Sequence, residues 1–348
     1  MSERYAATIA GIGMAHPPSV SQDELWRSFF AAHYAGVARG LAKRVFENSG
    51  VRNRHGVVNP IVEDPSSWST GERMRRYAVE ALPLAKDALA GALAQSGVSA
   101  DELGTLVVCS CTGYATPGLD ILVARDLGLP VDARRVFVGH MGCYAALPGL
   151  SVASDAVALH GRPAALLCVE LPSLHVQPPS ADAQQAVAHA LFSDAAAAAV
   201  LVADGPGPRV VRVAARTDAA TADLMSWQVT DLGFRMGLHP RVPDVLARHV
   251  VPLVDQLLAG HDVDVAGITA WAVHPGGPRI LDVVAEQLNL AAGALAESRR
   301  TLAEHGNCSS ATVLLTLATL LRRPGQLGGP AAMLAFGPGL TLYGALLR

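Results

Sequence analysis

Lysine is almost missing from this chain of 348 residues. Lys43 and Lys86 are the only lysines among 27 basic side chains, and neither follows a glycine. The Gly-Lys-Ser/Thr element of a phosphate-binding loop is therefore absent, which excludes Walker-type ATP hydrolysis. The formal net charge of -3 leaves no basic excess to neutralise a row of phosphates. The composition therefore argues against nucleic-acid binding.

Cysteine and long apolar runs are also scarce. Five cysteines are an odd and sparse set for this length, so we expect reduced thiols and a cytoplasmic protein. The longest uninterrupted apolar run, Ala195 to Ala203, is far shorter than the ~18 to 20 residues of a membrane span. Residues 1–17 resemble neither a signal peptide nor a transit sequence. We therefore expect no membrane-crossing segment.

What the chain does contain is alternating strand-like and helical segments, with 51% hydrophobic residues overall. The strand-like runs are apolar on both faces, as in the buried strands of an α/β protein. The predicted strands are Ala6 to Gly11, Thr105 to Cys111, Ala164 to Glu170, Ala195 to Val202, Val210 to Ala215, Gly267 to Val273 and Ala331 to Phe336.

Two amphipathic helices, Glu72 to Gln95 and Val242 to Ala259, each precede a strand that ends in a Gly/Pro-rich loop. This parallel order predicts two related halves, 1–205 and 206–348, divided at the turn formers of 204–208. Related halves packed face to face would bring distant residues to a shared centre. The pair Gly11 and Gly13 lacks the third glycine of a dinucleotide fingerprint, which argues against a nicotinamide cofactor.

Cys143 is the first candidate for chemistry. It lies among small residues in Gly139 to Ala146, at the start of a long apolar segment that we predict to be a helix, 144–160. A thiol at a helix amino terminus is expected to have a lowered pKa, and backbone amides there can bind an oxyanion. The alternative is a buried structural cysteine.

Two partners occur in later loops. His274 directly follows the strand that ends at Val273, and Asn307 lies in a polar loop before the apolar helix Ala311 to Leu321. An imidazole activates a thiol, and an amide can donate to an oxygen that gains charge. Taken singly, His274 could be a satisfied loop histidine and Asn307 a helix cap.

Five segments together resemble the type III polyketide synthases, the chalcone and stilbene synthase superfamily with a thiolase-like αβαβα layered fold. They are Gly142-Cys143, Leu191 to Ala195, Trp271 to Leu281, Ser298 to Asn307 and Phe336 to Thr341. The resemblance implies that Cys143 accepts a starter acyl group from coenzyme A. It also implies that His274 holds the thiolate as an ion pair and later donates to the thioester carbonyl. Together with Asn307, it would stabilise the enolate formed from malonyl-CoA.

The resemblance assigns further residues to the substrate cavity. Phe192 and Phe234 look like the gatekeepers, and the loop of Gly337, Pro338 and Gly339 looks like a cavity wall. Cys111 shares a predicted strand face with Cys109 and is interpreted as cavity-lining. Thr116 occupies a position that reaches into the partner's cavity in related homodimers. The basic residues Lys43, Arg44 and Arg54 are the candidates for binding CoA, with a solvated basic surface as the alternative.

The resemblance implies acyl-CoA and malonyl-CoA as substrates, with no cofactor, no metal ion and no acyl carrier protein. We expect a medium or long aliphatic starter and an alkylpyrone or alkylresorcinol product. Two enzymatic alternatives are a 1,3,6,8-tetrahydroxynaphthalene synthase that uses malonyl-CoA alone, and a ketoacyl-ACP synthase III-type fatty-acid enzyme. A non-catalytic partner subunit is a further alternative, which predicts loss of Cys143, His274 or Asn307.

Overall fold

The computed structural model describes residues 7–36, 38–322 and 328–348. Nine of the described strands join one mixed sheet in the order β11-β12-β13-β8-β1-β7-β6-β4-β5. Their bounds are β1 (Ala7–Ala15), β4 (Thr105–Cys109), β5 (Arg134–Val138), β6 (Ala164–Glu170), β7 (Ala195–Val202), β8 (Arg209–Thr217), β11 (Ala270–Val273), β12 (Ala331–Gly337) and β13 (Thr341–Leu347).

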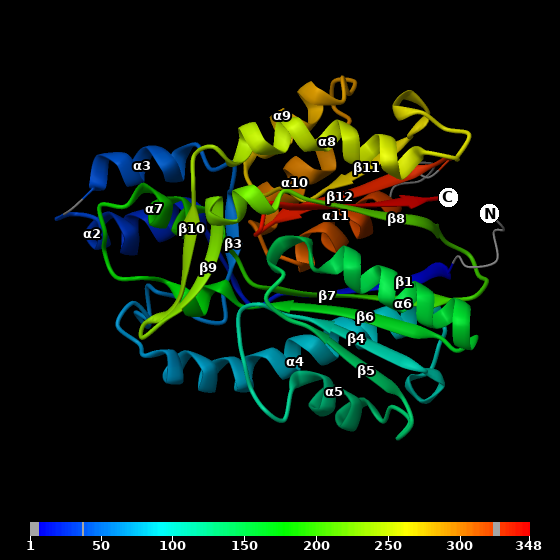
Figure 1. Ribbon diagram of the computed structural model, residues 1–348. Helices are drawn as coiled ribbons and strands as arrows, with labels where there is room; N and C mark the ends of the chain where they lie inside the picture. Colours follow the sequence, from blue (N-terminus) through cyan, green and yellow to red (C-terminus); the bar gives the residue numbers. More distant parts are fainter. Residues whose placement is uncertain (1–6, 37, 323–327) are drawn as a thin grey trace.

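The sheet folds into two layers at one weak seam. Strands β8 and β1 pair only through Ala7 with Val210 and Thr8 with Arg209. One layer holds β11, β12, β13 and β8, and the other holds β1, β7, β6, β4 and β5. Figure 1 shows these layers with helices α6 (Ala146–His160) and α11 (Ala311–Leu321) between them.

Helices cover both outer faces. α4 (Thr70–Ser96) and α5 (Leu119–Leu127) cover one layer, and α8 (Val242–Leu258) and α9 (Pro278–Gln287) cover the other (Figure 1). α4 begins with a capping box, in which Ser69 and Glu72 exchange hydrogen bonds. The result is five alternating layers, helix-sheet-helix-sheet-helix.

The middle helices are apolar because both of their faces meet a sheet. Nearly every residue of α11 is buried, and α6 packs against β4 and β6. The stretch Gly142–His160 is long and apolar enough to cross a membrane, yet half of it is buried in the fold. Its place between two sheets is that of a core helix.

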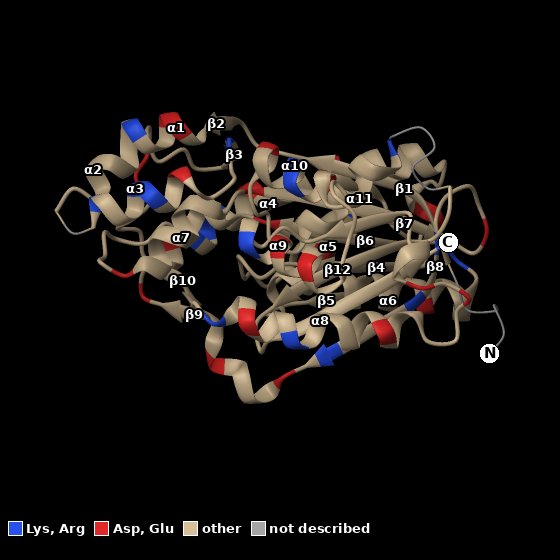
Figure 2. Cartoon of the chain, turned by 90° about the horizontal axis from the view of Figure 1, so that it is seen from above, with Lys and Arg blue, Asp and Glu red and all other residues tan. Residues whose placement is uncertain are grey.

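A smaller region caps one end of the sheets. It contains α1 (Gln22–Leu25), α2 (Ala31–His33), α3 (Arg39–Glu47), α7 (Ala183–Leu191), the pair β2 (Ser19–Ser21) and β3 (Asn53–His55), and the hairpin β9 (Met225–Thr230) and β10 (Gly233–Leu238). Helix α10 (Ala296–His305) packs on α11 and β11 and also contacts β3. Figure 2 shows acidic and basic residues interspersed along the chain. Strand β8 is an exception, since Arg209, Arg212 and Arg216 give it charge of one sign.

Most predicted elements are confirmed, with shifted ends. β6, β7 and α11 have the predicted bounds, and the α/β class is correct. The predicted strand at 267–273 begins only at Ala270, because Asp264 caps a short helical turn at Val265–Gly267. The first residue of the predicted first strand, Ala6, lies outside the described residues. The edge strand β5 was missed because its residues are mostly exposed.

Candidate active site

Cys143 lies in a tight turn, Gly142–Tyr144, that leads directly into α6. Gly142 has φ +72°, and a Cβ there would come within 2.8 Å of the Pro338 ring. A Cβ on Gly337 would lie 2.7 Å from the Tyr144 ring. The glycines therefore allow the loop after β12 to press against the nucleophile turn. This contact gives the predicted cavity wall its place beside Cys143.

Cys143, His274 and Asn307 border one cavity of about 410 Å³, although they come from three separate elements. Cys143 precedes α6, His274 follows β11, and Asn307 follows α10. The structure therefore brings the three predicted residues together. Phe192 borders the same cavity.

Asn307 has a fixed orientation. Its Oδ1 accepts a hydrogen bond from the Ser309 backbone N–H at 2.9 Å. Its own backbone N–H donates to the Leu191 carbonyl at 2.8 Å, and its carbonyl accepts from the Ser193 N–H at 3.0 Å. Because Oδ1 is already paired with a donor, the amide NH₂ is the group left for a ligand.

His274 is held by its backbone and leaves its ring free. The His274 N–H donates to the Leu334 carbonyl at 2.8 Å. Both ring nitrogens are buried and have no hydrogen-bond partner within the described parts of the chain. Burial lowers the pKa of His274 to about 3. The imidazole is therefore neutral and available to donate or accept a proton.

The expectation of a lowered pKa for Cys143 is wrong for the free enzyme. Burial raises the pKa of this thiol to about 12, against hydrogen bonds from Ser309 and Asn307 that favour the thiolate. The cost of removing the thiolate from water outweighs its stabilisation by the helix amino terminus. Burial thus favours the neutral forms of Cys143 and His274 in place of the expected ion pair.

Glu170, at the end of β6, was not identified from the sequence. It is fully buried, and burial raises its pKa. Its carboxylate accepts hydrogen bonds from the Cys111 N–H at 3.0 Å, the Thr112 hydroxyl at 2.8 Å and the Ser310 hydroxyl at 2.6 Å. The sequence signal that could have identified Glu170 is its position as the one carboxylate at the end of an otherwise apolar strand.

Cys111 borders a small space beside Cys143, but the strand prediction for it is wrong. Strand β4 ends at Cys109, so the shared strand face with Cys109 does not exist. The Cys109 thiol donates to the Ala145 carbonyl, whereas Cys111 Sγ lies 3.5 Å from Ser309 Oγ. This small space of about 20 Å³ has room for about one water molecule.

The gatekeeper prediction needs a correction at one position. Phe234 does not border the cavity of Cys143, because its ring stacks on His175 with centroids 4.4 Å apart. Met236, two residues further on β10, borders that cavity instead. Trp227 fills the neighbouring space, and its Nε1–H donates to the Cys111 carbonyl at 2.8 Å.

The candidate CoA-binding residues differ in position. Lys43 and Arg44 are exposed on α3, next to Val45, which borders the cavity. Arg54 is buried and donates to the carbonyls of His189 and Phe192. It therefore cannot reach a CoA phosphate, and that prediction is wrong. Arg279, which the sequence did not single out, borders the cavity and is largely exposed.

Thr116 and Gly339 complete the predicted set. Thr116 is exposed in the single chain and does not border the cavity of Cys143. Gly339 has φ +82°, so the turn between β12 and β13 requires the left-handed conformation that glycine adopts readily. The five cysteines are all free thiols.

Comparisons with known proteins cover nearly the whole chain. Residues 1–206 match the N-terminal domain of chalcone and stilbene synthases, and residues 213–348 match the C-terminal domain. The chain is 36% identical to a 1,3,6,8-tetrahydroxynaphthalene synthase of Streptomyces peucetius subsp. caesius, covering 90% of this chain and 85% of that protein.

Two other comparisons also find similarity to polyketide synthases over most of the chain. The chain is 32% identical to the alpha-pyrone synthesis polyketide synthase-like Pks18 of Mycobacterium tuberculosis, over 87% of this chain and 81% of that one. The crystal structure of PKS-I from the brown alga Ectocarpus siliculosus superposes with a TM-score of 0.92 at 28% identity, covering 99% of this chain and 98% of that one.

Proposed function

Because this chain belongs to the chalcone and stilbene synthase family and is a type III polyketide synthase with a thiolase-like fold, we propose that Cys143, His274 and Asn307 are its catalytic residues. The observation that carries this proposal is their convergence on one apolar cavity. It also argues against the non-catalytic alternative, since all three residues are present. Family matches over both halves leave no support for the fatty-acid-type alternative.

Loading begins with a neutral thiol. Cys143 transfers its proton to a ring nitrogen of His274, and the thiolate attacks the carbonyl carbon of the acyl-CoA. The carbon-sulfur bond to CoA then breaks, and the departing sulfur takes the proton from His274. The products are acyl-Cys143 and free CoA. The neutral, unpartnered imidazole of His274 suits both proton transfers.

Extension then uses malonyl-CoA. The Asn307 amide and the N–H of neutral His274 donate hydrogen bonds to the thioester oxygen while the bond to the carboxylate breaks and carbon dioxide leaves. Phe192 supplies an apolar wall, which favours loss of the charged carboxylate as a neutral gas. The enolate carbon attacks acyl-Cys143, so a carbon-carbon bond forms and the thiolate is released.

We place the starter in the aliphatic class. Val187, Leu191, Leu238, Leu246 and Leu340 line the cavity of about 410 Å³, and such a surface suits a hydrocarbon chain. The product is then an alkylpyrone or alkylresorcinol. CoA thioesters are used directly, with no cofactor. We assign CoA phosphate binding to the exposed residues Lys43, Arg44 and Arg279, of which Arg279 borders the cavity.

A naphthalene-type product from malonyl-CoA alone is the second candidate. Two observations favour it: the narrow space beside Cys111, which Trp227 restricts, and the similarity to a tetrahydroxynaphthalene synthase. Incubation with labelled malonyl-CoA and a panel of short to long acyl-CoAs, followed by mass spectrometry, decides between them. Incorporation of aliphatic starters supports the first candidate, and exclusive use of malonyl-CoA supports the second.

We also propose a homodimer formed at the β5 edge. This edge strand is exposed, and Tyr114 and Phe137 nearby are 74% and 44% exposed. An open strand edge with exposed aromatic rings suits a second copy of the chain. Thr116 lies in the same loop as Tyr114. Sedimentation of the protein and of Phe137→Asp tests this proposal, and a parent protein that sediments as a monomer would contradict it.

A further inference from the structure

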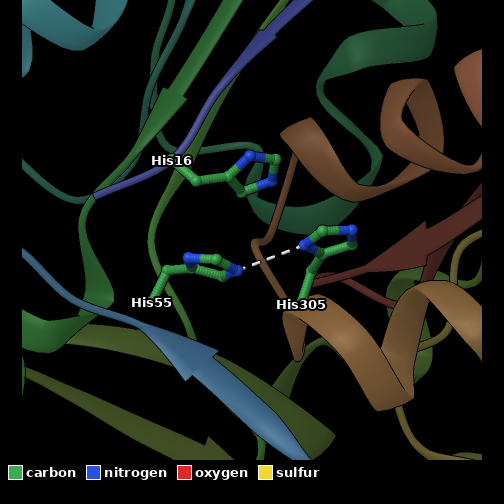
Figure 3. Close-up of side chains that lie close together, drawn as sticks. All are labelled: His16, His55 and His305. Atoms are coloured by element: carbon green, nitrogen blue, oxygen red, sulfur yellow. Dashed lines mark hydrogen bonds between the residues drawn. The ribbon is translucent and has the colours of Figure 1, made fainter. Parts of the chain in front are cut away.

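Three histidines from distant parts of the chain lie together outside the proposed active site. His16 follows β1, His55 ends β3, and His305 ends α10. Figure 3 shows their rings grouped around a common space. One ring nitrogen from each lies within 4.8 Å of the others. All three side chains are partly buried.

We propose that His16, His55 and His305 bind a divalent transition-metal ion of the zinc class. Nitrogen ligands on tetrahedral zinc lie about 2.0 to 2.1 Å from the ion, and therefore roughly 3.3 Å from one another. His305 Nδ1 and His55 Nε2 are 3.2 Å apart, which already matches one edge of such a tetrahedron (Figure 3). A water molecule would complete the coordination.

The hydrogen bonds of His55 support this assignment. Its Nδ1 lies 2.8 Å from the Pro17 carbonyl and must donate to it, so Nε2 carries a lone pair directed at the cluster. A ligand histidine that donates its second nitrogen to a backbone carbonyl is the usual arrangement around a metal ion. Without the ion, His305 Nδ1–H donates to that lone pair. On binding, this proton moves to His305 Nε2.

His16 is the third ligand. Its Nε2 is buried and has no hydrogen-bond partner within the described parts of the chain. Its ring stacks on that of His305, with centroids 4.5 Å apart and an angle of 18°. Because a lone pair lies in the plane of its ring, the His16 ring must rotate to face the ion. Glu304 favours positive charge on His305, and Arg300 disfavours it.

All three rings are ready to bind a cation without losing protons. Burial lowers the pKa of His16 to about 3 and also lowers the pKa values of His55 and His305. His55 and His305 further disfavour charge on His16, and His55 does the same for His305. Neutral imidazole is the form that binds metal.

The proposed metal site connects to the active site through one short segment. Only Gly306 separates His305 from Asn307. The His55 carbonyl accepts a hydrogen bond from the Asp194 N–H at 2.9 Å, two residues after Phe192. An ion would therefore tie together the end of β1, β3 and the loop that carries Asn307. This role is structural and independent of the proposed reaction.

The test is a zinc titration of chelator-treated protein. We use the Cys143→Ala chain, so that the proposed nucleophile cannot bind the ion. The proposal predicts about one zinc ion per chain by dialysis and elemental analysis, with a rise of several degrees in Tm. Cobalt added in place of zinc should give visible bands of a tetrahedral site without a thiolate charge-transfer band.

Variants assign the ligands. His16→Ala and His305→Ala should each weaken zinc binding by at least tenfold. His261→Ala, on the turn after α8, is the matched control and should bind like the parent. Circular dichroism checks that each variant is folded. The cobalt spectrum is recorded on the parent of these variants, the Cys143→Ala chain, so it does not depend on the folding of the histidine variants. The proposal is overturned if the parent binds no stoichiometric ion, if the spectrum shows thiolate ligands, or if both variants bind like the parent.

Discussion

Replacing Asn307 with Asp separates the two halves of the proposed reaction. The Asp side chain has nearly the same shape, and one carboxylate oxygen can still accept the Ser309 N–H, which lies 2.9 Å from Oδ1 in the parent. The other oxygen then faces the cavity in place of the NH₂ donor. The change therefore alters the charge and donor capacity of this group and leaves its position fixed.

The expected loss in the rate of carbon dioxide release follows from replacing an NH₂ donor with a carboxylate oxygen. Removing one donor from a developing oxyanion costs about 2.7 to 4 kcal/mol, or roughly 10² to 10³ in rate. A carboxylate beside the enolate adds repulsion, so carbon dioxide release from malonyl-CoA should fall by at least about 100-fold. Asn307 also favours the Cys143 thiolate, but Ser309 supplies a second hydrogen bond to it. Acyl-enzyme formation should therefore fall as well, by a smaller factor than carbon dioxide release.

The assay measures both steps on the same protein. Mass spectrometry of the intact chain counts acyl-Cys143, and labelled malonyl-CoA reports carbon dioxide release. Asn289→Asp, at an exposed position that does not border the cavity, is the matched control and should leave both steps nearly unchanged. A loss of less than about tenfold in carbon dioxide release, or an equal loss in both steps, would refute the assignment of Asn307 to the enolate.

Three further predictions test the geometry. Trp227→Ala should widen the narrow space beside Cys143 and lengthen the products, and an unchanged product profile by mass spectrometry would contradict this. Because burial raises the pKa of Cys143 to about 12, alkylation by iodoacetamide should accelerate about tenfold per pH unit between about pH 7 and 9. A rate independent of pH would instead indicate a stable ion pair with His274. Gly142→Ala places a Cβ 2.8 Å from a proline ring at φ +72°, so the free energy of unfolding should fall by about 2 kcal/mol in chemical denaturation; an unchanged value would contradict this packing.

The sequence predicted the parts of the site that have a local signal. Cys143 among small residues and His274 after a buried strand are local signals, yet each alone also fits a structural residue. The five family-like segments taken together made them candidates. Asn307 became meaningful only beside those two. The α/β class followed from strands that are apolar on both faces.

The residues that were missed or misassigned depend on long-range packing. Glu170 is an active-site neighbour only because β6 ends beside α11. Arg54 looks like a surface cation in sequence, yet it is buried under Phe30 and Phe46. Met236 and Phe234 lie two residues apart on one strand, and only the tertiary fold decides which of them meets Cys143.

Phe192 and Asn307 form an isolated parallel β-bridge, and this bridge has a consequence for how the enzyme can be altered. The two residues are joined through their main chains, by the bonds of Asn307 N–H to Leu191 and of Ser193 N–H to Asn307. The side chain at position 192 can therefore be exchanged for a larger or smaller one while the amide of Asn307 stays where it is. Insertions or deletions in this segment would instead displace the amide. Libraries aimed at new products should accordingly randomise side chains around the cavity and keep the length of both segments constant.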